Sequence, residues 1–206
     1  MQQIDADPAS LSNRDRILRT SIDLFAQKGF ATVTTREIAA AVGIKAASIY
    51  NHFTSKEAIL DEIVSMFCLG LRERVHPAFD ASQALDVKCF LDGVTHANDV
   101  FFSEPLNALI GVILMREQFQ NERIRLMLLT EMIDVPRRMI SAYFERLMQT
   151  GRMRVAEPTF AAREYHAFFV YEFYASALAF GLREPDLEAL AQRDTHVQLF
   201  LDTWAL

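Results

Sequence analysis

Apolar residues recur along most of the chain with the period of an α-helix. From about residue 14 to residue 28, Ile17, Leu18, Ile22 and Phe25 are spaced so that they share one helix face. A two-residue alternation of apolar and polar positions, which indicates a β-strand, is not sustained in any segment. The seven glycines and six prolines fall mainly where such helices would end. The pattern therefore predicts an all-α fold.

Two short helices are predicted directly after the first helix, whose N-cap we expect to be Asn13. Thr34 and Glu37 form a Thr-x-x-Glu capping box, which satisfies free backbone amides where a helix begins. Gly43 is expected to end this helix, because glycine readily adopts the left-handed conformation of a sharp turn. A further short helix follows from about Lys45 to Tyr50. Two short helices joined by such a turn are typical of a helix-turn-helix, although a helical hairpin that merely packs on a core has the same pattern.

The rest of the chain is predicted to form a larger helical bundle. Thr54 to Glu57 has the pattern of a second capping box and opens a long helix. The helices expected from this point cover residues 54–75, 84–102, 106–117, 122–150, 159–182 and 186–204. Pro136 lies inside one of them and is expected to kink or divide it.

Charged residues divide the chain into a small basic part and a larger acidic part. The formal net charge is −6, but residues 13–58 contain seven Lys/Arg and four Asp/Glu, a balance of +3. The remaining residues contain 14 basic and 23 acidic side chains, a balance of −9. The overall negative charge argues against a protein that coats nucleic acid or membranes indiscriminately.

The composition favours a soluble, cytoplasmic protein with a well-filled core, since apolar residues make up 51% of the chain. The most apolar run, residues 167–182, has sixteen residues and contains Glu172, so we expect a buried helix and not a membrane span. The N-terminal segment has no apolar signal region. Cys68 and Cys89 are expected to be buried free thiols, because neither belongs to a Cys-x-x-Cys pair or a Cys/His cluster.

No catalytic or metal-binding arrangement stands out from the helical pattern. Asp92, His96 and Asp99 recur on one side of a predicted helix, opposite an apolar stripe that includes Phe90 and Val94. We interpret these three residues as a solvated face and not as a metal or acid–base site. Glycine-rich phosphate loops and the GxSxG and HExxH motifs do not occur in the sequence. The sequence therefore predicts a protein that is not an enzyme and has no cofactor or metal.

A motif with many parts lies between Arg16 and Leu60. Its residues are Phe25, Gly29, Phe30, Thr34, Ile38, Ala39, Gly43, Ile44, Ile49, Tyr50, His52, Phe53, Lys56 and Glu57. In type and spacing they resemble the DNA-binding domain of the tetracycline-repressor (TetR) family of bacterial transcription regulators. The segment covers about a fifth of the chain, and Ala47 departs from the glycine or proline that is common at its position in the family.

The resemblance implies a three-helix helix-turn-helix DNA-binding domain over residues 12–60 and a C-terminal effector-binding and dimerisation domain over residues 61–206. At the groove-facing start of the recognition helix it puts Lys45, Ala46, Ala47 and Ser48, which can contact base edges. Phosphate contacts are expected from Tyr50, His52 and Lys56. The opposite wall of the groove is expected to be contacted by Thr34, Thr35 and Arg36.

A module of this size offers few base contacts, so specific binding usually needs two modules on half-sites about 34–36 Å apart. We therefore expect a homodimer that binds a near-palindromic operator in double-stranded DNA. From Ala167 onward, the helix 159–182 is apolar around its whole circumference, so one side can cover the core and the other a partner subunit. In the family, the final helix pair forms the dimer interface, and we expect the same of residues 159–204.

The C-terminal region of the family usually encloses an effector pocket, and the Phe, Met and Tyr residues found here suit a small apolar or aromatic effector. The candidate contact residues are Phe67, Leu71, Phe101, Met115, Phe119, Met132, Tyr143, Phe168 and Glu172. For Glu172, structural pairing and a pocket contact are equally open. The sequence thus predicts a transcriptional repressor released by a ligand. The alternatives are a regulator of the same fold without a small-molecule effector and a helical-bundle enzyme.

Overall fold

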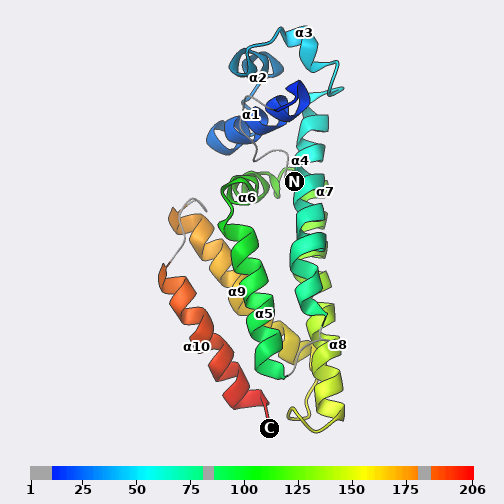
Figure 1. The fold of residues 1–206 in the computed structure, drawn as a ribbon, viewed down its shortest axis with the longest axis vertical. Coiled ribbons are helices and arrows are strands. Elements are labelled where there is room, and N and C mark those ends of the chain that lie inside the picture. The colour runs from blue at the N-terminus through cyan, green and yellow to red at the C-terminus, as the bar shows by residue number, and fades with distance from the viewer. Residues whose placement is uncertain (1–10, 81–85, 181–186) are drawn as a thin grey trace.

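The computed structural model describes residues 11–80, 86–180 and 187–206. Helices dominate these residues, which contain no β-strand and only an isolated bridge between Met153 and Ala205. The all-α prediction is confirmed (Figure 1). The elements are α1 (Asn13–Lys28), α2 (Thr35–Val42), α3 (Ala46–Ile49), α4 (Lys56–Gly70), the π-helical turn η1 (Leu71–Val75), the 3₁₀ turn η2 (His76–Phe79), α5 (Val87–Ser103), α6 (Pro105–Glu117), α7 (Glu122–Leu128), the π-helical turn η4 (Leu129–Asp134), α8 (Val135–Gln149), α9 (Pro158–Phe180) and α10 (Leu187–Trp204).

Two predicted helix starts differ from the structure by one residue. Asn13 is already the first residue of α1, and the hydroxyl of Ser12 caps the helix by accepting from the amide of Asp15 at 3.2 Å. In the same way Ser55, and not Thr54, caps α4, where its hydroxyl accepts from the amide of Ala58 at 3.1 Å. Adjacent residues of equal capping ability make the cap position ambiguous in the sequence.

Two predicted helices contain irregular turns. The expected helix 54–75 is α-helical as far as Gly70 and then continues as the π-helical turn η1. The expected helix 122–150 is divided into α7, η4 and α8, and Pro136 lies in the first turn of α8. Proline is tolerated there because the first amides of a helix need no intrahelical partner.

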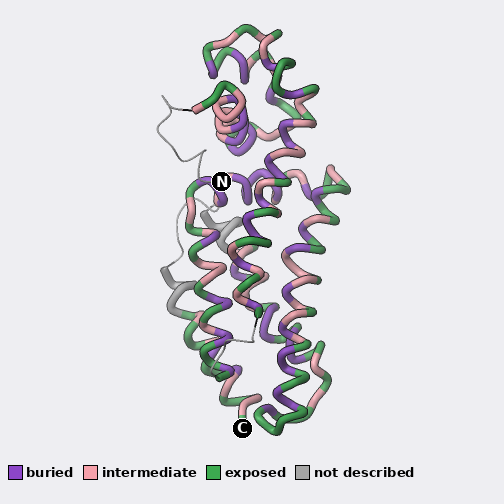
Figure 2. The backbone as a smooth tube through the Cα atoms, turned by 45° about the vertical axis from the view of Figure 1, so that its right-hand side comes forward, coloured by how far each residue is buried: buried purple, intermediate pink, exposed green. Residues whose placement is uncertain are grey.

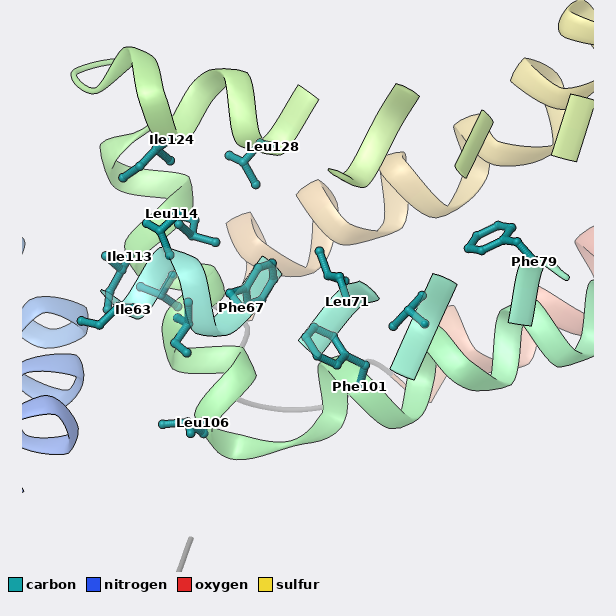
Figure 3. Packing of buried hydrophobic residues seen from close by; sticks show 14 of the residues in the cluster. Ile63, Phe67, Leu71, Phe79, Phe101, Leu106, Ile113, Leu114, Ile124 and Leu128 are labelled. Carbon is teal, nitrogen blue, oxygen red and sulfur yellow. The ribbon is translucent and has the colours of Figure 1, made fainter. Parts of the chain in front are cut away.

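The three N-terminal helices sit at one end of an elongated body, and α4 runs from them into it (Figure 1). The helix α6 lies against α1, and α8 packs along α9. Buried residues form one apolar cluster that extends from Ile17 in α1 to Phe200 in α10 (Figure 2). At its centre, Phe67 of α4 meets Phe101 of α5 edge to face, with 5.3 Å between the ring centroids (Figure 3).

Both cysteines are free, as predicted, but they are not both buried. Cys68 is half-buried on α4, whereas Cys89 is exposed. Cys89 immediately precedes the buried Phe90 on α5, and neighbouring positions of a helix point in different directions. Within the described ranges, no helix is long and apolar enough to cross a membrane.

Lys56 holds the loop between α1 and α2 against the start of α4. Its Nζ donates to the carbonyl oxygens of Phe30 and Val33, both at 2.8 Å. The same ammonium lies 4.3 Å from the centroid of the Phe30 ring, within the range of a cation–π interaction. Lys56 therefore connects the start of α4 with the α1–α2 loop of the N-terminal module, which comprises α1, α2 and α3.

We expect Lys56→Met to lower the free energy of unfolding by about 2 kcal/mol, because it removes charge-assisted hydrogen bonds to two carbonyl groups. Urea unfolding followed by circular dichroism measures this change. Lys45→Met is the matched control, since Lys45 is exposed and its side chain makes no hydrogen bond to the described residues. Equal unfolding midpoints for the two variants would show that Lys56 does not hold the loop.

Candidate functional site

The second helix begins with the predicted capping box. The hydroxyl of Thr34 accepts from the amide of Glu37 at 3.2 Å, and Oε2 of Glu37 accepts from the amide of Thr34 at 2.8 Å. The hydrogen bond from the Thr34 backbone, together with one from Lys28, lowers the pKa of Glu37. At the other end Gly43 adopts φ 79°, in the left-handed region that the turn into α3 requires. The geometry of α2 and its turn is thus fixed by local interactions.

The third helix presents small side chains to solvent. It is shorter than predicted, since Lys45 and Tyr50 are its flanking cap residues. Lys45, Ala47 and Tyr50 are exposed and Ser48 is half-exposed, whereas Ile49 is buried. Ala46 packs against the core, so it is less available to a partner than the other candidates for base contacts.

The remaining DNA-contact candidates differ in their availability. Thr34, Arg36 and His52 are exposed, and Thr35 is half-buried. Lys56 uses two of its three N–H donors on the carbonyls of Phe30 and Val33. In the described part of the N-terminal module, Arg36 and Lys45 are the cationic side chains without an ion pair or hydrogen bond to the protein.

The other cations of this module stabilise its structure. Arg16 Nη2 donates to the carbonyl of Val42 at 2.6 Å, at the end of α2. Lys28 lies 3.2 Å from Glu37, and Arg14 lies 3.0 Å from Glu62 of α4. Because these cations have partners within the protein, the positive charges that remain available to a phosphate are those of the α2–α3 surface, Arg36 and Lys45.

The body contains a cavity of about 880 Å³. Its walls come from η1 and η2, from α5, α6 and α7, from η4, and from α8, α9 and α10. The apolar lining residues are Leu71, Val75, Phe79, Val100, Phe102, Pro105, Ala108, Leu109, Leu128, Leu129, Met132, Ile133, Pro136, Phe169, Val170 and Phe173. A cavity of this size and lining suits a small organic molecule.

Three of the nine predicted effector contacts, Leu71, Met132 and Glu172, lie on this cavity wall. The other six do not line it. Phe67 and Phe101 pack against each other in the core, Phe119 is 82% exposed, and Tyr143 lies 4.1 Å from Phe90 between ring centroids. Phe168 stacks on His196 with a centroid distance of 4.3 Å, and the Sδ of Met115 lies 3.5 Å from Nε2 of Gln118.

Several polar groups on the wall were not predicted. Glu131 is buried and accepts from Nε of Arg72, which lies 3.2 Å from both carboxylate oxygens. At another place on the wall, the hydroxyl of Tyr174 donates to Oε1 of Gln118 at 3.0 Å. No short motif marks these pairs, because their members are more than fifty residues apart in the sequence.

His166 is another polar group on the wall that was not predicted. It is 9% exposed, and its Nδ1 has no hydrogen-bond partner in the described structure. Burial lowers the pKa of His166 to about 4, and the positive charge of Arg137 contributes to the shift. The imidazole is therefore neutral near pH 7. The sequence offered one signal for a buried histidine here, because His166 directly precedes the apolar run 167–182.

The acidic residues around His96 are more involved in the structure than a solvated face would be. Asp92 pairs with Lys88 at 2.6 Å, as an exposed helical pair does. Asp99, however, pairs with Arg193 of α10, and both His96 and Asp99 line the cavity. The solvated-face interpretation is thus wrong for Asp99. Among the described residues, no group of His, Cys, Asp and Glu could hold a metal ion.

Direct hydrogen bonds and ion pairs connect the N-terminal helices with the body. Arg116, at the end of α6, donates from Nη1 to the carbonyl of Ala26 in α1 at 2.6 Å. Asp61 of α4 pairs with Arg123 of α7 at 2.8 Å. Because α6 and α7 also line the cavity, elements of its wall contact the helices that support α2 and α3.

Family models and curated relatives match this chain. Residues 17–63 match the family described as bacterial regulatory proteins, tetR family, and residues 99–205 match the C-terminal domain of AefR-like transcriptional repressors. The transcriptional repressor KstR2 of Rhodococcus jostii strain RHA1 is 39% identical over 77 residues, which cover 35% of this chain and 38% of KstR2. The chain spans well under half the length of the curated relatives that it matches.

Solved structures match nearly the whole chain, and two of them illustrate the likeness. PfmR, a TetR family transcriptional regulator of Thermus thermophilus, is 25% identical with a TM-score of 0.70, over 91% of this chain and 98% of PfmR. SmeT of Stenotrophomonas maltophilia, in complex with triclosan, is 18% identical with a TM-score of 0.72, over 94% of this chain and 92% of SmeT. Since the AefR-like match alone spans more than half of the chain, the protein belongs to the TetR family of bacterial transcriptional regulators.

Proposed function

We propose that this regulator is a repressor that binds a near-palindromic operator as a homodimer and is released by a small apolar or aromatic effector. The observation that carries the proposal is the path from the cavity to the DNA-contact surface. Leu71 and Val75 on the cavity wall belong to η1, which directly continues α4. The helix α4 begins next to the loop that Lys56 holds against α2.

The proposed DNA contacts follow the exposure of α2 and α3. Lys45 and Ser48 read base edges, and Ala47 permits close approach of the backbone in the major groove. Arg36, Tyr50 and His52 contact phosphates on either side. Lys56 acts mainly by holding the loop before α2, and its third N–H remains available to a phosphate.

The proposed dimer interface lies on α9 and α10. Tyr171 of α9 is 67% exposed and Leu199 of α10 is 61% exposed, although both are large apolar side chains. Two large exposed apolar side chains on neighbouring helices are consistent with an interaction surface on α9 and α10. A twofold pairing of these helices would supply the two α3 helices that a palindromic site requires.

The proposed switch acts through η1 and α6. Ala108 and Leu109 of α6 line the cavity, and Arg116 of the same helix holds α1. A ligand that moves α6 or η1 therefore changes the orientation of the N-terminal module and the spacing of the two recognition helices. The likeness to SmeT, which was solved with triclosan, supports an aromatic effector.

A regulator without a small-molecule effector is the second candidate. A body without a cavity would favour this candidate, because it would have no room for a ligand. The cavity of about 880 Å³ therefore argues against it. The enzyme alternative has no specific observation in its favour, so we propose no catalytic role.

We expect Arg36→Ala to weaken DNA binding about equally for all sequences and to reduce the slope of log K against log salt by about one, as the loss of one phosphate contact does. Fluorescence anisotropy with operator and random duplexes at several salt concentrations measures both quantities. Arg138→Ala, an exposed arginine of α8, is the control. An unchanged slope for Arg36→Ala would remove Arg36 from the interface.

The unmodified protein is expected to be a dimer at micromolar concentration, and Tyr171→Glu is expected to yield monomers, because a charge would be buried at the interface. Light scattering coupled to size exclusion gives the mass directly. Val155→Glu introduces the same charge at an exposed apolar position outside α9 and α10 and should leave the dimer intact. A monomeric unmodified protein would refute this interface.

Arg116→Gln is expected to separate effector binding from DNA release, because it weakens the contact between α6 and Ala26 without altering the cavity wall. In the unmodified protein an effector should lower operator affinity roughly 5–150-fold, and in the variant by less than about twofold. Calorimetry of effector binding and anisotropy of operator binding measure the two quantities. If the variant still releases DNA fully, the switch does not pass through Arg116.

A further inference from the structure

Three buried nitrogen atoms in or near the cavity wall have no hydrogen-bond partner among the described residues. Two of them, Nδ1 of His166 on α9 and Nε of Arg193 on α10, belong to lining residues. A third, Nε of Arg137 on α8, does not belong to a lining residue, but the charge of Arg137 acts on His166. None of these atoms has a hydrogen-bond partner in the described parts of the chain.

Such atoms are uncommon because a buried polar group without a partner is destabilising. An arginine nitrogen can only donate, so the Nε–H groups of Arg137 and Arg193, which have no partner, both require an acceptor. Neutral His166 has one ring nitrogen that donates, and it becomes a donor at both nitrogens if a nearby negative charge favours its protonated form. The three residues together therefore suit a ligand group that accepts hydrogen bonds.

The charged groups around the cavity indicate which charge the bound ligand group should carry, because most of them already have partners. Asp99 is paired with Arg193, and Glu131 is paired with Arg72. Glu172 is also engaged within the protein. Arg125 is paired with Glu122, and His76 lies 3.3 Å from the backbone oxygen of Glu131.

Arg137 is different from these groups, since its side chain has no ion pair or hydrogen bond with any described residue. A cationic ligand would find the wall carboxylates already engaged, whereas an anionic group would find unfilled donors and a positive charge. A positive charge that is partly removed from water, as on half-buried Arg137, is stabilised most effectively by a directly bonded anion.

We propose that the ligand of this cavity carries an oxyanion head group, such as a carboxylate or sulfonate, that binds His166 and Arg193 beside the charge of Arg137. This inference rests on the proposed effector role of the cavity. The apolar body of the ligand lies along Phe169 and Phe173. His166 and Tyr174 are eight residues apart on α9, so the cavity extends roughly 12 Å along this helix.

The two ends of the cavity differ in chemistry. The hydroxyl of Tyr174 already donates to Gln118, so that end needs no ligand group for its hydrogen bonds. The end at His166 does need one. An amphipathic anion therefore has a defined orientation, with its head at His166 and its apolar end toward α6 and α7.

Two fluorescent dyes with the same aromatic body test the proposal. 8-Anilinonaphthalene-1-sulfonate carries an oxyanion, and N-phenyl-1-naphthylamine is its neutral counterpart. The neutral dye is the more apolar of the two, so the absolute affinities of the two dyes cannot be compared directly. The decisive quantity is the ratio of their dissociation constants in each variant, compared with the same ratio in the unmodified protein. Titrations with the whole 206-residue chain, checked for one site per chain, give both constants.

His166→Phe keeps the ring volume and removes the nitrogen atoms. We expect it to weaken sulfonate binding about tenfold, as for the loss of one charge-assisted hydrogen bond, and to change binding of the neutral dye less than about twofold. Arg137→Gln should also weaken the sulfonate selectively, whereas Arg138→Gln, at the adjacent exposed arginine, should not. Retained binding of the neutral dye shows that each variant has an intact cavity.

Equal losses for the two dyes, or no loss for either, would overturn the oxyanion proposal. Operator anisotropy in the presence of each dye keeps this result separate from the proposed function. If the neutral dye releases operator and the head group has no effect, the switch stands and the oxyanion proposal fails. If the sulfonate binds through His166 but no dye changes operator affinity, the oxyanion site stands and the proposed switch fails.

Discussion

A single hydrophobic core joins the N-terminal helices to the body, and α4 supplies its central side chains. Ile59 and Ile63 of this helix are buried toward the N-terminal end, and Phe67 is buried between α4 and α5. Because protein interiors are closely packed, a rotation of α4 cannot be absorbed locally and must move the helices packed on it. The orientation of the DNA-contact surface therefore depends on how the body is packed.

The π-helical turns η1 and η4 contribute residues to the wall of the cavity. The π-helical turn η1 contributes Leu71 and Val75 to the wall, and η4 contributes Glu131 and Met132. The wider turns of a π-helix disrupt regular hydrogen bonding, and they are frequent at functional sites. The Arg72–Glu131 pair links η1 with η4 across the wall. A ligand between these turns would act on the irregular segments that follow α4 and precede α8.

The sequence predicts best those features that local interactions decide. The capping box at Thr34 and the turn at Gly43 depend on neighbouring residues, and both occur as predicted. The π-helical turns were not predicted, because the four-residue spacing of Phe67, Leu71 and Val75 also fits an α-helix. Few of the residues that line the cavity were predicted. Which side chains of a helix face the cavity depends on how that helix is rotated against helices that lie far away in the sequence. Phe119 and Phe168 are aromatic like the true lining residues, yet one is exposed and the other stacks on His196.

The distribution of charge adds a constraint on how the protein approaches DNA. The span 13–58 has a balance of +3 and the rest of the chain a balance of −9, so phosphates attract one end of the molecule and repel the other. Most cations of the N-terminal module are bound internally, as Arg16 and Lys56 are, which leaves few unpaired charges on the α2–α3 surface. A surface with few phosphate contacts binds DNA weakly unless two copies are held at the correct spacing. In the switch proposed above, a change of spacing worth only about 1–3 kcal/mol would be sufficient for regulation, and a ligand in the cavity would not need to unfold or detach any helix to produce it.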